Sequence, residues 1–70
     1  MNQISWYESN QFLFDTTGFP PMKGDLMVRT NQKGRFRVTE VTRVVTEVKT
    51  GSLISYVERY EVDVIFEDRG

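Results

Sequence analysis

The chain has 70 residues, enough for one domain with a small core, and its formal net charge of −1 gives no overall positive field to attract nucleic acid or an anionic membrane. It contains no Cys and no His, so the commonest general base, the thiolate nucleophile, the usual zinc ligands and disulfide bonds are all missing. With 39% hydrophobic and 27% charged residues, it is too apolar for a disordered chain. We therefore expect one folded domain over residues 1–70 that is not an enzyme, holds no metal or cofactor and takes no small-molecule substrate.

No apolar run approaches the length of a membrane span, and residues 1–5 lack a basic stretch followed by an apolar one. Neither a signal peptide nor a membrane anchor is therefore expected. The absence of Cys fits a reducing compartment, so these features predict a cytoplasmic protein that does not bind membranes. A domain this small without disulfides or zinc is often stabilised by oligomerisation.

The N-terminal part of the chain predicts short strands joined by turns. Ile4–Tyr7 and Phe12–Phe14 each suit a strand, although a helical turn across residues 3–9 is the alternative. Asp15–Gly18 has the side chains of a turn. Phe19–Met22 must be extended, because its two prolines fix their own φ angles and restrict the residue before them.

A first hairpin is expected next. Lys23–Asp25 turns the chain into a strand over Leu26–Arg29, and residues 30–34 make a polar hairpin loop. The hairpin that gathers apolar residues on one face has the pairs Val28 with Phe36 and Leu26 with Val38.

The C-terminal half predicts two long strands around a turn at Lys49–Ser52, because apolar and polar residues alternate as in strands with one buried face. In the first of these strands the apolar phase moves from even positions up to Val38 to odd positions from Val41. Such a slip requires one extra residue, so we predict a β-bulge at Thr39–Glu40. The pairs expected from this register are Val45 with Tyr56, Val41 with Tyr60, Val38 with Val62 and Phe36 with Val64.

These elements predict an all-β fold: a small antiparallel five-stranded SH3-like barrel or strongly curled sheet with a long C-terminal hairpin. An OB-like barrel is the second choice. Strongly bent small sheets of this kind remove their exposed edges by closure.

A basic stretch around the first hairpin loop is one candidate binding site. Its positive residues are Arg29, Lys33, Arg35 and Arg37, with no acidic residue among them. A basic hairpin on a small barrel can hold a phosphate backbone, with Arg29, Lys33 and Arg35 as the contacts. The alternative is a structural role, since the expected register sets Arg37 opposite Asp63 as an exposed cross-strand pair.

The far end of the long hairpin is the other candidate. Val44, Leu53 and Val57 lie on the phase opposite to the one that the barrel core needs, yet they are apolar. Such residues predict a protein interface, with a second copy or another protein covering them. The alternative is that the strand bends sharply near Arg43 and the barrel buries both faces.

Three segments, Pro20–Val28, Phe36–Val41 and Tyr60–Val64, give the chain a resemblance to short phage and mobile-element reading frames with SH3-like barrels. The shared pattern is a proline-led Gly-Asp turn into a strand, an aromatic-x-Val-x-x-Val strand and a final Val-x-Val strand. The resemblance implies a non-enzymatic accessory protein in the host cytoplasm, either an inhibitor of a host or defence factor or a small structural component. It carries over no functional residue.

The sequence therefore predicts a protein-binding module, such as a phage-type accessory protein that binds or inhibits a host factor, or a homodimer. The alternative is a nucleic-acid-binding small barrel that uses the basic hairpin at residues 29–37. Unpaired positive charge would favour the second function and surplus apolar surface the first.

Overall fold

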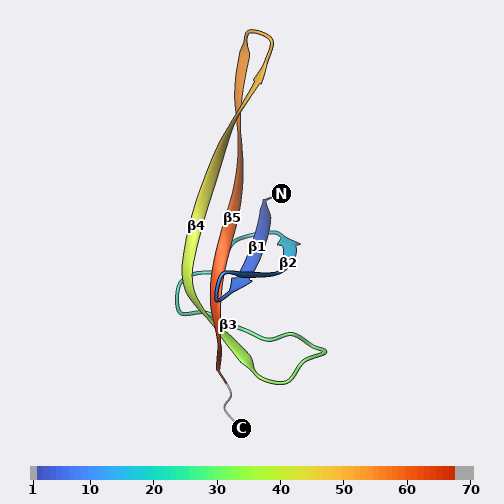
Figure 1. Ribbon diagram of the computed structural model, residues 1–70, viewed down its shortest axis with the longest axis vertical. Coiled ribbons are helices and arrows are strands. Elements are labelled where there is room, and N and C mark those ends of the chain that lie inside the picture. Colours follow the sequence, from blue (N-terminus) through green and yellow to red (C-terminus); the bar gives the residue numbers. More distant parts are fainter. Residues whose placement is uncertain (1, 68–70) are drawn as a thin grey trace.

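The computed structural model describes residues 2–67, which form five β-strands (Figure 1). The strands are β1 (Gln3–Glu8), β2 (Gln11–Thr17), β3 (Leu26–Met27), β4 (Arg35–Thr50) and β5 (Leu53–Glu67). Within these described residues there is no helix that is long and apolar enough to cross a membrane.

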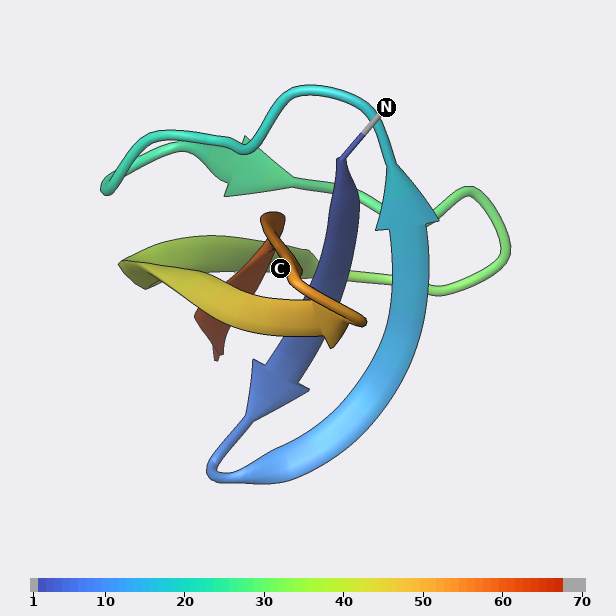
Figure 2. The ribbon, with the colours of Figure 1, turned by 90° about the horizontal axis from the view of Figure 1, so that it is seen from above.

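The five strands make one sheet in the order β2-β1-β5-β4-β3, and this sheet curls into a half-barrel with β2 and β3 at its two edges (Figure 2). The all-β class, the strong curl and the long C-terminal hairpin are as predicted. The sheet is mixed, however, because β1 runs parallel to β5 while every other neighbouring pair is antiparallel.

The β1–β2 hairpin settles the open question about the N-terminus, because residues 3–8 are strand and not a helical turn. Its two-residue loop consists of Ser9 and Asn10, whose φ angles of 50° and 65° are those of a type I′ turn. The turn expected at residues 15–18 is wrong in its first part. There β2 continues to Thr17, and only Gly18, with φ of 125°, leaves the strand.

Residues 22–25 form the predicted turn into β3. The backbone N–H of Asp25 donates to the Met22 carbonyl at 3.0 Å, and the Met22 N–H donates to the Asp25 carboxylate at 2.9 Å. Gly24 has φ of 95°, the left-handed value that a type II turn requires at its third position.

The register expected for the first hairpin is wrong by one residue. The observed pairs are Leu26 with Arg37 and Met27 with Phe36, so Met27 packs on the core while Leu26 and Val28 are exposed. The cause lies in the turn itself. The backbone N–H of Gly24 donates to the Val38 carbonyl, and the backbone N–H of Val38 donates to the Asp25 carbonyl, both at 2.8 Å. These two bonds fix the register before β3 begins.

The bulge in β4 is confirmed. Val38 pairs with Val64 and Glu40 with Asp63, so Thr39 is the extra residue. Its hydroxyl donates to the backbone carbonyl of Asp63 at 3.1 Å, at the point where the bulge interrupts the backbone hydrogen bonds between β4 and β5.

The β4–β5 register differs from the prediction by two residues, with Val41 opposite Val62 and Val45 opposite Glu58. The hairpin closes over only Gly51 and Ser52, rather than over four residues, and Gly51 has the positive φ of 63° expected at the first position of a type II′ turn. Because a shift of two residues preserves the alternation, every side chain stays on its predicted face.

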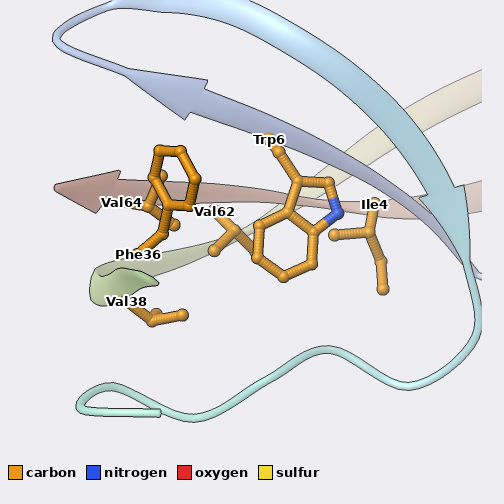
Figure 3. Close-up of a cluster of buried hydrophobic side chains, with 6 residues drawn as sticks. All are labelled: Ile4, Trp6, Phe36, Val38, Val62 and Val64. Carbon is orange, nitrogen blue, oxygen red and sulfur yellow. The ribbon is translucent and has the colours of Figure 1, made fainter. Parts of the chain in front are cut away.

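The core lies at one end of the long hairpin, where β1 crosses beside β5 (Figure 3). Its buried members are Ile4, Trp6, Phe36, Val38, Val62 and Val64, and its half-buried members include Leu13, Phe14, Met27, Val41 and Tyr60. The Trp6 ring stacks on Phe14 with centroids 5.8 Å apart, and its Nε1 donates to the Thr16 hydroxyl at 2.8 Å. The one polar group of this large side chain is therefore satisfied, which makes its burial favourable.

Gly34 should be the glycine that least tolerates a side chain. A Cβ at this position would overlap with Cε2 and Cζ of Phe66, whose ring packs edge-on against Phe36. Gly34→Ala should lower the free energy of unfolding by about 1 kcal/mol for the left-handed φ of 98° and by about 1–3 kcal/mol more for overpacking. Gly24→Ala is the matched control, because its φ is 95° but nothing lies within 4 Å of the added Cβ. Equal losses for the two variants in chemical denaturation would contradict the packing argument.

Candidate interaction arm

The distal part of the long hairpin projects from the half-barrel as a two-stranded arm, in which residues 45–50 of β4 pair with residues 53–58 of β5 (Figure 1). β1 pairs with β5 only over residues 59–64, and β3 pairs with β4 only at residues 36–37. The described residues span 56 × 20 × 20 Å, which reflects the length of this arm. The alternative in which the strand bends near Arg43 and the barrel buries both faces is therefore wrong.

The predicted interface residues share one face of the hairpin, which we call the valine face: Leu53 and Val57 on the arm and Val44 at its base, with Val48 among them. Val44 pairs with Arg59 and Thr46 with Val57, so the two valines are diagonal neighbours. Leu53 lies at the tip, opposite Thr50, with Val48 between it and the two valines. Leu53 is 74% exposed and Val57 56% exposed, while Val44 is half-buried. The structure thus brings the predicted residues onto one face, with Val48 between Leu53 and the other two valines in the register.

The opposite face of the arm, which we call the tyrosine face, carries Val45, Ile54 and Tyr56. The sequence pattern assigns these residues to the phase of the core, but they are 51%, 55% and 66% exposed. The reason is the shortness of β1, which ends the core near Val41 and Tyr60. The arm therefore presents apolar side chains to solvent on both faces.

Charged side chains on the tyrosine face are arranged along β4. Arg43 donates to the Glu58 carboxylate at 2.6 Å, and this hydrogen bond, together with the charge of Glu58, raises the pKa of Arg43 above its ordinary value. Glu47 lies on the same face four residues farther along, opposite Tyr56. The arm thus carries a positive and a negative side chain on either side of Val45.

The predicted basic site does not come together as four free charges. The Arg29 guanidinium lies over the Phe14 ring, 4.7 Å from its centroid, and donates to the Gln32 side chain at 3.3 Å. Arg37 donates to the Glu67 carboxylate and to the Gly24 carbonyl. The expected partner Asp63 is wrong, because the shifted register sets Arg37 opposite Ile65 and beside Glu67.

Of the four positive residues in the predicted basic site, Lys33 in the loop and Arg35 at the start of β4 are the two without such contacts to described residues. Both are exposed, and neither forms an ion pair with another residue of the described part of the chain. Among residues 2–67 there is also no group of three or more acidic side chains placed to hold a metal ion.

Comparison of the chain with known protein families, curated proteins and solved structures finds no significant match. The resemblance to small phage-type barrels is accordingly confirmed only as a small all-β curled half-barrel, and no family is identified.

If the loop binds nucleic acid, Lys33 and Arg35 must supply the contacts. The double variant Lys33→Glu with Arg35→Glu should reduce oligonucleotide binding to background, and binding by the unsubstituted protein should fall steeply with added salt. Lys49→Glu, which reverses a charge on the arm, should leave binding unchanged. Gel shift or fluorescence anisotropy measures both effects. Failure of the unsubstituted protein to bind single- or double-stranded oligonucleotides at low salt would exclude this function.

Proposed function

We propose that this protein is a non-enzymatic protein-binding module whose binding surface is the arm. One observation carries the proposal: the arm exposes apolar side chains on both faces, and apart from each other its strands have no described neighbour. We place it with SH3-like accessory proteins of phages and mobile elements, acting on a protein in the host cytoplasm or on a second copy.

The physical support for this proposal is that an uncovered arm is an unfavourable structure. A two-stranded hairpin without a third strand is marginally stable in water. Exposed apolar surface and free strand edges also favour aggregation, so natural proteins cover or charge them. A partner that covers the valine face would remove this apolar surface from water, and each apolar side chain that it buries contributes about 1.5–3 kcal/mol.

Nucleic-acid binding is the second candidate, and it rests on Lys33 and Arg35 alone. Arg29 and Arg37 are held by Phe14 and Glu67, and both contacts tie the loop and β4 to the rest of the half-barrel. Two exposed positive side chains on a chain of net charge −1 make a weak electrostatic site.

Substitutions on the valine face test the first function. Val44→Asp and Val57→Lys should each weaken binding through the valine face, to another protein or to a second copy, by about 10- to 100-fold, because each removes one apolar contact of about 1.5–3 kcal/mol. The isolated domain should stay folded, because Val57 is exposed and the half-buried Val44 does not belong to the core. Light scattering and a thermal melt are measured for each variant.

The matched controls are Asn31→Asp and Asn31→Lys, which add the same charges in the loop of residues 28–34, at the other end of the molecule from the arm tip (Figure 1). They should leave association and capture unchanged. If Val44→Asp and Val57→Lys instead unfold the domain, these residues belong to the core and the arm is not the binding surface.

A further inference from the structure

We propose that the arm pairs with a second copy of this chain, edge to edge along β4, in an antiparallel register that sets Val45 opposite Val45 of the second copy. This inference rests on the proposed function of the arm and names its partner. Two independent features of the described residues select this partner and this register: the length of the free edge and the order of its charges.

The outer edge of β4 is the longest free edge in the described structure. Residues 22–27 and β3 occupy this edge as far as Val38, and the strand then continues unpaired on that side to Thr50. The free segment, residues 40–50, contains no Pro or Gly, and its one Lys, Lys49, lies next to the tip. Six of the eight residues from 41 to 48 are β-branched, the side chains that favour strands: Val41, Thr42, Val44, Val45, Thr46 and Val48.

The free edge can pair over its full length with the same edge of a second copy. The free segment begins at Glu40, just past the bulge, and ends at Thr50, so its midpoint is Val45. In a two-fold pairing centred on Val45, Glu40 lies opposite Thr50 of the second copy. The turn before β3 occupies the edge at Val38, two residues before Glu40. All of the free edge is therefore used in this pairing.

The charges of the edge favour the same register. The free segment carries four charged side chains, Glu40, Arg43, Glu47 and Lys49, and Arg43 and Glu47 lie two residues on either side of Val45. The two-fold pairing sets Arg43 opposite Glu47 of the second copy, and it does so twice. Opposite charges facing each other across an antiparallel pair are stabilising, and like charges are destabilising.

The neighbouring registers that keep the same faces together are less favourable. A centre at Val44 sets Arg43 opposite Val45 and Glu47 opposite Val41. A centre at Thr46 sets Arg43 opposite Lys49. A centre at Arg43 or at Glu47 sets that residue opposite itself. Among these five registers, only the centre at Val45 matches both charges.

The paired arms would form a four-stranded antiparallel sheet. Arg43 would then lie between Glu58 of its own β5, which it already contacts at 2.6 Å, and Glu47 of the second copy. The valine faces of the two copies would join into one continuous surface, as would the tyrosine faces, and each arm would gain the further strands that a stable sheet requires.

Charge reversal tests the register. Each single variant should dimerise weakly with itself, and the two variants should dimerise with each other. Arg43→Glu makes positions 43 and 47 both negative and Glu47→Arg makes both positive, so each variant alone should dimerise at least about 10-fold more weakly than the unsubstituted chain. A 1:1 mixture of the two restores both opposite-charge pairs and should form a heterodimer. Sedimentation measures dimerisation, and native mass spectrometry distinguishes the heterodimer by mass. Lys49→Glu, which makes the same charge change opposite Val41, should dimerise as the unsubstituted chain does.

A monomer at every concentration, dimers that both charge reversals leave intact, or a mixture that stays monomeric would each overturn the proposed pairing. The valine-face variants separate this failure from failure of the proposed function. If the unsubstituted chain is monomeric but captures a protein that Val44→Asp no longer captures, the second-copy pairing is wrong and the binding arm stands. A monomer without arm-dependent capture overturns both.

Discussion

The extra residue in β4 at Thr39 is the constraint on which the rest of the architecture depends. Phe36 and Val38, before it, and Val41, after it, all face the core, although an unbroken strand would turn Val41 outward. Thr39 makes this change of phase possible, and its hydroxyl bonds the Asp63 carbonyl that the bulge leaves. Bulges also bend and twist a strand. One residue therefore lets a single long hairpin serve as barrel wall at one end and as free arm at the other.

The half-barrel is closed by side chains where its backbone leaves a gap. β2 and β3 lie at opposite edges of the sheet and do not pair. Arg29, just past β3, reaches across this opening to the face of Phe14 on β2, which in turn stacks on Trp6. A guanidinium over an aromatic face contributes about 0.5–1 kcal/mol when exposed and more when it is desolvated. This contact explains why a residue from a basic stretch belongs to the structure of the domain.

What the sequence could predict is what alternation encodes locally: the long strands, the bulge, and the sharing of one face by Val44 and Val57. The strand registers are harder to predict from the sequence, because they depend on the geometry of the turns. Leu26-Met27-Val28 are all apolar and show no alternation, so only the bonds of Gly24 and Asp25 to Val38 decide which one faces inward. The exposure of Tyr56 was missed for a different reason. The place where the core ends is set by the parallel contact of β1 with β5, which residues so distant in the sequence do not reveal.

That parallel contact also dictates an order of events during synthesis. Gln3 pairs with Arg59 and Glu8 with Val64, so β1 has no neighbour in the sheet except β2 until β5 has left the ribosome. Loop closure over such a separation is slow compared with formation of a hairpin. Until β5 has emerged, Ile4 and Trp6 of the nascent β1–β2 hairpin therefore lack their partners in the core. β4 and β5 can pair from Gly51 onward as soon as both have emerged. Of the five described strands, β5 is translated last, and it is the one that completes the core.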